Sequence, residues 1–390
     1  MLQPLDGIKV LDLSRLLPGP YCSMILGDLG AEIIKIEEPK TGDPTRWSSP
    51  RIGSQSATFL NVNRNKKSLT LNLKDERGVE IFLKLAMSAD IILEGFRPGV
   101  VDRLGIGYSA VKEINRRIIY CSLTGYGQEG PHRERSGHDI NYLGLSGILG
   151  LTTDRDGNPV IPGIQIADLG GGLVATLAIL AAILARERSG AGQYIDISMF
   201  DVMLSLLPIP AASLFAGQDV PVGRKLHLSG ALACYNVYRT KDGKQLSVGA
   251  LEPKFWQRFC QTINRPDLID KQHCSESEQR EVIAQLREMF LTRTQQEWME
   301  MFSRTDACVE PVQNLDEAFS HPQTQHRAMI VETESTTGRI KQIGSPLKFS
   351  ATPASIRSAP PALGENTDEI LCSLGLSEAE IQELKRDGVC

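Results

Sequence analysis

Strand and helix signals alternate along the N-terminal half of the chain, and this alternation constrains the fold more than any other feature. Residues 8–13 form a short apolar run typical of a buried strand, residues 21–29 have helical spacing and end at Gly30, and residues 31–36 again predict a strand. Such a β-α-β unit implies a parallel strand pair with a right-handed crossover. Further strands are predicted at 91–94, 117–124 and 193–198, separated by helical segments. The pattern predicts an α/β fold with a large, open, mostly parallel Rossmann-like sheet covered on both faces.

A second, smaller domain is predicted because the pattern changes after about Gly217. The turn residues 241–244 separate two strand-like runs, 236–239 and 246–249, and predict a hairpin that is followed by helical segments. A chain of 390 residues is also longer than one ordinary core. We expect a large α/β domain from residues 1–217 and 326–390, and a small α+β domain from residues 225–325. Residues 338–360 are expected to return the chain between them.

Composition excludes several classes of protein. The formal charge of −5 argues against a general nucleic-acid binder, and the eight cysteines contain no C-x-x-C pair for a zinc ribbon or a dithiol redox motif. The turn after the first strand lacks Gly-x-Gly-x-x-Gly, so no nicotinamide or flavin cofactor is predicted, and no metal site is predicted. Scattered thiols and an N-terminus without a basic and apolar leader favour the cytoplasm.

The uncharged run from Leu169 to Ala185 invites a comparison with membrane spans. It is 17 residues long, which is the short limit for crossing a bilayer, and it contains three successive glycines. It begins after Asp168 and ends in Arg186, followed by a helix-stopping Ser-Gly pair. We therefore expect a helix buried on most sides within a domain, and no membrane association.

Two segments carry candidate catalytic residues. His138 lies in a polar turn next to Gly137, and Asp168 directly precedes the long apolar run, so it is predicted at a helix N-terminus. An imidazole and a carboxylate at such a place could exchange protons while negative charge develops on a substrate. The alternatives are structural: Asp168 as a helix cap and His138 as a hydrogen-bonding turn residue, with Asp139 and Asn141 as ordinary turn formers.

Basic residues and a third acid complete the set of candidates. Arg64 and Lys66 precede a strand-like segment, while Arg97 and Arg103 follow the strand at 91–94. Ligands of open parallel sheets bind outside the carboxyl ends of the strands, so these arginines could hold phosphates, or could simply form a solvated basic edge. Glu252 is followed by a proline and is predicted at a helix N-cap, as a functional carboxylate or by structural chance.

Over nearly its whole length, the sequence resembles the family III coenzyme A transferases. The resemblance rests on the motifs at residues 17–20, 27–31, 94–100, 124–128, 137–142, 167–168, 190–193 and 249–253. It implies a two-domain subunit that interlocks with a second copy as a homodimer, with the active site between the two copies. It also implies that coenzyme A enters as part of the substrate, so that no separate cofactor is needed.

Within this family, the resemblance implies two different roles for Asp168. In transferases it matches the nucleophile that forms acyl-enzyme anhydride and enzyme–CoA thioester intermediates. In the racemases of 2-methylacyl-CoA esters it matches an acid/base group paired with a histidine, here His138, and supported by a glutamate, here Glu252. Many transferases carry a Gly-Tyr-Asp motif where this chain has Gly137-His138-Asp139.

The leading prediction is therefore an isomerase that inverts the α-carbon of a 2-methylacyl-CoA ester by 1,1-proton transfer. Backbone N–H groups near Leu169 are expected to stabilise the enolate. The alternatives are CoA transfer between carboxylic acids through Asp168, and a non-catalytic acyl-CoA-binding protein. The resemblance implies contacts to the CoA ester from Arg64, Lys66, Leu71, Leu73, Gly95, Phe96, Arg97, Arg103, Gly137 and Tyr142. Glu38 stands where the racemases carry an arginine that contacts the CoA phosphates.

Overall fold

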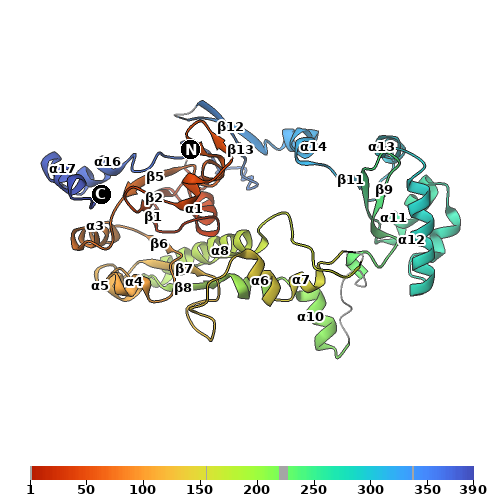
Figure 1. Cartoon of the computed structure of the whole chain (residues 1–390), viewed down its shortest axis with the longest axis horizontal. Coiled ribbons are helices and arrows are strands. Elements are labelled where there is room, and N and C mark those ends of the chain that lie inside the picture. The colour runs from red at the N-terminus through yellow and green to blue at the C-terminus, as the bar shows by residue number, and fades with distance from the viewer. Residues whose placement is uncertain (1, 155, 219–226, 336–337) are drawn as a thin grey trace. The chain divides into compact units, whose positions relative to one another are not determined.

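A computed structural model of the chain divides into two compact units, drawn in Figure 1. The structure describes residues 2–154, 156–218, 227–335 and 338–390. Unit 1 comprises Met1–Ser146, Pro162–Leu206 and Pro322–Cys390, and unit 2 comprises Gly147–Ile161 and Leu207–His321. Residues 147–161 and 207–217 therefore group with unit 2 and not with the large domain as expected. The expected start of the small domain, residue 225, lies outside the described residues.

Unit 1 contains the predicted parallel sheet. Its six strands lie in the order β5-β2-β1-β6-β7-β8, and every neighbouring pair is parallel. The strands are β1 Lys9–Asp12, β2 Glu32–Glu37, β5 Lys66–Thr70, β6 Ile91–Glu94, β7 Ile119–Thr124 and β8 Tyr194–Ser198. The chain builds outward from β1 to β5, then returns to place β6 on the other side of β1. This reversal creates a topological switch point between β1 and β6, where open α/β sheets bind ligands.

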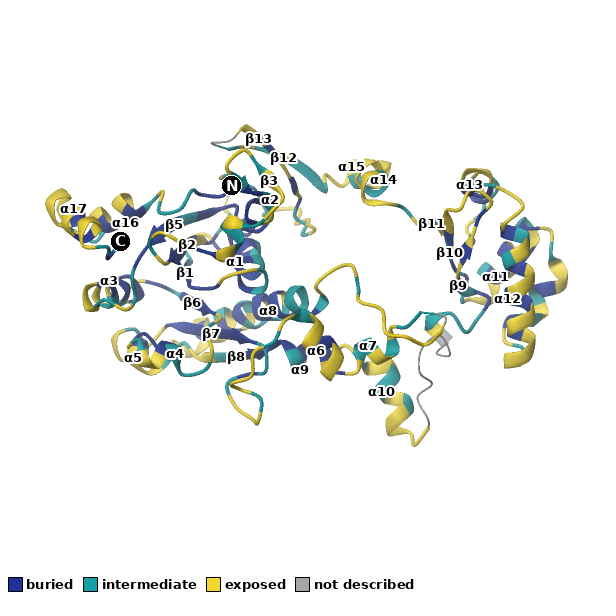
Figure 2. Ribbon diagram, in the orientation of Figure 1, coloured by how far each residue is buried: buried dark blue, intermediate teal, exposed yellow. Residues whose placement is uncertain are grey.

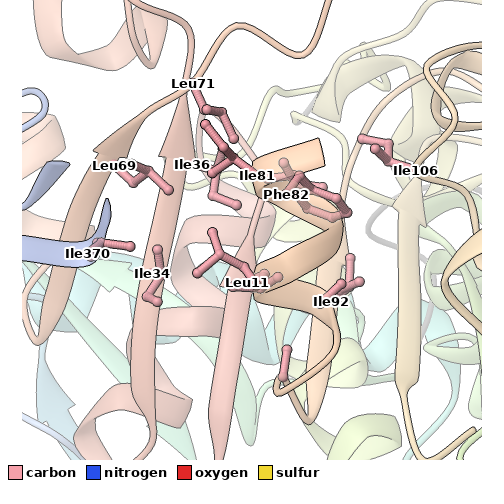
Figure 3. Close-up of a cluster of buried hydrophobic side chains, with 14 of the residues drawn as sticks. Leu11, Ile34, Ile36, Leu69, Leu71, Ile81, Phe82, Ile92, Ile106 and Ile370 are labelled. Atoms are coloured by element: carbon pink, nitrogen blue, oxygen red, sulfur yellow. The ribbon is translucent and has the colours of Figure 1, made fainter. Parts of the chain in front are cut away.

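Helices cover both faces of this sheet. On one face, Ile81 and Phe82 pack over Leu11, Ile34 and Ile92 (Figure 3), because alternate residues of each strand point to the same side. The helices that cover this face of the sheet are α3, α5, α16 and α17. Figure 2 shows the buried strands between the helices. The helices of unit 1 are α1 Pro18–Asp28, α2 Ala57–Val62, α3 Glu76–Ala86, α4 Val100–Arg103, α5 Tyr108–Ile114, α6 Asp139–Leu145, α8 Ile166–Ser189, α9 Met199–Ser205, α15 Pro322–His326, α16 Thr367–Ser373 and α17 Glu378–Arg386.

The long apolar helix α8 packs against α1 and β7. The two helices approach closely because Gly172 has no side chain: a Cβ there would lie 2.6 Å from the Pro18 carbonyl oxygen. The helix is less buried than expected, since Leu173, Leu177 and Leu184 are 51%, 67% and 65% exposed. By length and composition α8 could cross a membrane, although the same test is passed by core helices of soluble proteins. We expected a helix buried on most sides, but the outer side of α8 carries exposed leucines.

Unit 2 contains the predicted hairpin. Strands β9 and β10 pair antiparallel and β11 extends the sheet, while aromatic side chains including Trp256, Phe259 and Phe290 fill the core beneath it. The elements are α7 Ile148–Leu151, α10 Pro208–Phe215, β9 Tyr235–Arg239, β10 Gln245–Gly249, α11 Pro253–Thr262, α12 Glu276–Phe290, α13 Gln295–Phe302, β11 Val309–Pro311 and α14 Leu315–Ser320.

Two small hairpins belong to unit 1. One pairs β3 Arg51–Ile52 with β4 Gln55–Ser56, and the other pairs β12 Ile330–Ser335 with β13 Gly338–Ile343. The second hairpin lies where part of a plain return segment was expected. Strand β13 alternates exposed and buried positions, and its Gln342 donates a hydrogen bond to the Leu60 carbonyl, so the hairpin is tied to α2.

Candidate active site

A cavity of about 360 Å³ opens at the switch point of the sheet. The segments after β1, β6 and β7 all contribute to it, as do the segment before α6 and the first turn of α8. We call it the switch-point cavity. Its lining residues are Ser14, Arg15, Leu16, Pro18, Gly19, Gly95, Phe96, Arg97, Pro98, Leu123, Thr124, Gly125, Tyr126, Arg133, Arg135, Ser136, Gly137, His138, Tyr142, Asp168 and Met199. The structure thus brings His138 and Asp168 to one cavity.

Among the residues that the structure describes, Asp168 is the only acidic one that lines this cavity. It is the third residue of α8 and not its N-cap, which is Gln165, so the helix begins three residues before the expected start near Leu169. Burial raises the pKa of the Asp168 carboxyl to about 6, with a smaller contribution from the negative charge of Asp139, and the positive form of His138 opposes the shift. A carboxyl that titrates near neutrality can both accept and return a proton.

His138 is the N-cap of α6 and is solvent-exposed. Its backbone N–H donates to Asn141 Oδ1 at 3.0 Å, while Asn141 N–H donates to the His138 carbonyl at 2.8 Å. These bonds fix the backbone at the start of α6. The imidazole is exposed and lines the cavity, so a ligand in the cavity can reach it.

Asp139 plays a part that its reading as an ordinary turn former missed. Its Oδ1 accepts the N–H of Ala167 at 2.6 Å and that of Asp168 at 3.2 Å, across 28 and 29 residues of sequence. The N–H of Leu169 donates to the Gln165 carbonyl. The backbone N–H groups expected to stabilise an enolate near Leu169 are thus already bonded within the protein, and that part of the prediction is wrong.

Positive charge gathers around the cavity instead. Four arginines line it, from the segments after β1 and β6 and from the segment before α6, against the single carboxylate of Asp168. They are Arg15, Arg97, Arg133 and Arg135. Guanidinium groups bind phosphates and other anions through several N–H donors at once. The cavity is therefore suited to an anionic ligand, or to a reaction that develops negative charge.

A neighbouring cavity of about 310 Å³ shares Arg15 and Phe96 with the switch-point cavity, and we call it the adjoining cavity. The Arg15 guanidinium lies 5.3 Å from the centre of the Phe96 ring, a cation–π pair at the boundary between the two. Leu71 and Leu73 line the adjoining cavity as predicted contacts, and the exposed Lys74 was missed although it follows them directly. Together the two cavities could hold an extended ligand.

Two predicted phosphate contacts are corrected by the structure. The Arg64 side chain is buried and paired with Asp28 at 2.7 Å, and Lys66 is buried and paired with Asp12 at 3.3 Å. Neither lines the switch-point cavity or the adjoining one. A buried cation that leaves its partner would strand an unpaired carboxylate, which is strongly unfavourable. These residues hold β5 and α2 against α1 and β1, and they are not available to phosphates.

Of the other residues predicted to contact the ligand or to act in catalysis, some line the switch-point cavity and some do not. Gly95, Phe96, Arg97, Gly137 and Tyr142 line the switch-point cavity. The exposed Arg103 lines neither cavity, and Glu252, although it is the N-cap of α11 as predicted, belongs to unit 2.

Glu94 supports the loop that lines both cavities. It is buried at the end of β6, and its Oε2 accepts the Phe96 N–H at 2.7 Å. Burial raises the pKa of this carboxyl to about 7.

Among the described residues, no cluster of three potential metal ligands is present.

Known proteins resemble this chain over nearly all of its length. The sequence model of CoA-transferase family III matches residues 5–367. Succinyl-CoA:glutarate CoA-transferase of Homo sapiens is 37% identical, covering 100% of this chain and 90% of that protein. Alpha-methylacyl-CoA racemase of Homo sapiens is 35% identical, covering 99% and 97%. The crystal structure of a CAIB/BAIF family protein from Brucella suis superposes with a TM-score of 0.85 at 29% identity, covering 96% of this chain and 100% of that one.

Proposed function

The chain belongs to CoA-transferase family III, and from that premise we propose that it is an acyl-CoA racemase. The observation that carries the proposal is the meeting of His138 and Asp168 in one cavity, each from a different helix. A 1,1-proton transfer needs two such groups, one on each face of the reacting carbon. A 2-methylacyl-CoA ester is the proposed substrate, because its α-carbon is chiral and the thioester acidifies its α-proton.

In the proposed mechanism, one group removes the α-proton and the other supplies a proton to the opposite face. When Asp168 is ionised and His138 is protonated, the carboxylate removes the proton and the imidazolium returns one; the reverse reaction uses the opposite protonation states. The intermediate is a planar enolate with negative charge on the thioester oxygen. Because the Ala167 and Asp168 N–H groups are bonded to Asp139, we assign the stabilisation of this charge to the arginines of the cavity.

We further propose that the acyl thioester lies in the switch-point cavity and the nucleotide end of CoA in the adjoining cavity. Leu71 and Leu73 offer apolar contact there, and Lys74 and Arg15 offer positive charges. Three carboxylates also line this cavity: Glu37 is paired with Arg46, Asp43 is paired with Lys35, and Glu38 stands where the racemases carry an arginine. Coenzyme A is then part of the substrate, and the two cavities meet at Arg15 and Phe96.

Replacing Arg97 tests this placement. Arg97 lines the switch-point cavity next to Phe96, which lines both cavities, so we propose that it pairs with a CoA phosphate where the ligand passes from one cavity to the other. Because such a pair contributes a charge-assisted bond, Arg97→Ala should weaken binding of the acyl-CoA and flatten its dependence on salt. Isothermal titration of the full CoA ester and of the acyl-pantetheine fragment measures both effects. Arg304→Ala, an exposed arginine of unit 2, is the control and should bind as the wild type does. If Arg97→Ala bound both ligands as tightly as the wild type, the placement would be wrong.

A second candidate function is CoA transfer between carboxylic acids. It is favoured by the 37% identity to a succinyl-CoA:glutarate CoA-transferase and by the position of Asp168 as the sole lining carboxylate, which could attack a thioester. Trapping separates the two functions. During turnover with an acyl-CoA and an acceptor acid, hydroxylamine or borohydride should leave Asp168 unmodified in a racemase. Modification of Asp168, detected by mass spectrometry, would favour the transferase.

We also propose that the protein is a homodimer, and that Glu252 of one subunit supports His138 of the other. The exposed leucines of α8 form an apolar surface that an isolated subunit would leave in water. Leu177→Lys places a charge on that surface and is expected to shift the protein from dimer to monomer in analytical ultracentrifugation. Leu291→Lys, an exposed leucine of unit 2, is the control and should stay dimeric. A wild type that sediments as a monomer of 42.8 kDa would overturn the proposal.

A further inference from the structure

The side chain of Asp139 links the start of α6 to the start of α8. Its neighbour His138 caps α6, and its own Oδ1 accepts the Ala167 and Asp168 N–H groups at 2.6 and 3.2 Å. Two groups that line the cavity from different helices are thus connected through one carboxylate. The connection is tertiary, because it joins residues about thirty positions apart.

Helix α8 needs such an acceptor. The first N–H groups of a helix have no partner within the helix, and its N-cap residue, Gln165, makes no side-chain capping bond. A carboxylate near a helix N-terminus is also favoured by the positive end of the helix dipole. Asp139 therefore caps α8 from another element. Its half-buried side chain holds the first turn of α8, and Asp168 with it, against the His138 segment.

The charge of Asp139 also acts on Asp168. After burial, it is the next largest cause of the raised pKa of Asp168, and the positive form of His138 acts in the opposite direction. The other charged groups that line the cavity are Arg15, Arg97, Arg133 and Arg135. Removing the negative charge of Asp139 should therefore lower the pKa of Asp168, while leaving burial unchanged.

We propose that Asp139 is a positioning residue that ties α6 to α8 and so fixes His138 and Asp168 around one substrate carbon. The inference rests on the proposed proton-transfer function for its kinetic consequences. The tie itself and its electrostatic effect on Asp168 do not depend on which reaction the enzyme performs. The two can therefore be tested separately.

Two substitutions separate the effect of losing the hydrogen bonds to α8 from the effect of losing the negative charge. In Asp139→Asn the amide oxygen can still accept two N–H groups, but the negative charge is gone. We expect its kcat to stay within a few-fold of wild type, while the acid limb of kcat/KM moves to lower pH, because that limb follows the free-enzyme pKa of Asp168. In Asp139→Ala the tie is lost as well. We expect kcat to fall on the order of a hundred-fold with little change in KM, which is the scale of a misplaced catalytic group.

Asp75 provides the matched control. Its side chain accepts the Arg77 N–H at 3.0 Å as the N-cap of α3, and it lines neither cavity. Asp75→Asn and Asp75→Ala should leave both kcat and the acid limb in place. Loss of activity in these variants equal to that in the Asp139 variants would reduce the effect to general helix capping and overturn the proposal.

A direct titration gives a readout that is independent of the reaction. Carbon-13 labelled aspartate allows NMR titration of the Asp168 carboxyl, assigned by its absence in Asp168→Asn. The midpoint should lie lower in Asp139→Asn than in the wild type. An unchanged midpoint, or an Asp139→Ala enzyme with wild-type kcat, would overturn the proposal. If Asp139→Ala does not fold, the titration and kinetics of Asp139→Asn decide. If the enzyme proves to be a transferase, the titration result still stands or fails on its own.

Discussion

Asp168→Asn should abolish inversion of a 2-methylacyl-CoA ester while leaving a folded protein that still binds it. The carboxamide has nearly the same shape but cannot take or give a proton, so at least roughly a hundred-fold of rate should be lost. Proton exchange on the face served by His138 should survive in part, because each group serves one face. Chiral chromatography of a single starting epimer measures inversion, and mass spectrometry measures exchange.

Asp201→Asn is the control for this prediction. Asp201 is the third residue of α9, as Asp168 is the third residue of α8, but it is exposed and does not line the cavity. The same chemical change in the same helical position should therefore leave inversion unaffected. Substantial inversion by Asp168→Asn would remove this residue from the proposed mechanism.

His138→Ala should lower α-proton exchange from its face by roughly a hundred-fold or more, the usual contribution of a general acid/base group. The fold should be retained, because the His138 ring is exposed and its two backbone hydrogen bonds with Asn141 remain. The complementary pattern is expected: inversion is lost, and exchange through Asp168 persists. Imidazole added to the solution should restore part of the exchange rate, because it can occupy the space left by the ring and transfer the proton in its place.

His326→Ala serves as the control for His138. It is an exposed histidine at the end of α15, far along the chain and absent from the lining of both cavities. It should show wild-type exchange. Wild-type exchange by His138→Ala itself would contradict the role that we propose for this residue, and would assign the proton transfer on its face to another group.

Much of the fold could be predicted because its signals are local. Strands such as β2, β6 and β7 carry short apolar runs, and the helix stop at Gly30 and the turn at 241–244 depend on neighbouring residues only. The position of the switch-point cavity could be expected from topology, since segments after the strands of a parallel sheet meet at one edge. The sheet order was not predictable in this way, because pairing joins distant segments.

Burial and long-range partners account for what was missed. Arg64 and Lys66 look like a basic surface cluster, and only the fold shows that Asp28 and Asp12 pair with them inside the protein. In the sequence Asp139 looks like a turn residue, because the two N–H groups that it binds belong to α8, 28 and 29 positions further along the chain. The outer face of α8 is apolar in sequence like its inner face, so its exposure could not be read from hydropathy.

The most direct test of proton transfer is α-carbon exchange by the wild-type enzyme in deuterated water. A single epimer of a 2-methylacyl-CoA ester is incubated with no free carboxylic acid, and the ester is analysed by mass spectrometry and chiral separation. Proton transfer by His138 and Asp168 predicts one deuterium at the α-carbon together with conversion to the other epimer. An ester that keeps its α-proton and configuration, and loses its CoA only when an acceptor acid is added, would contradict the racemase and identify a transferase.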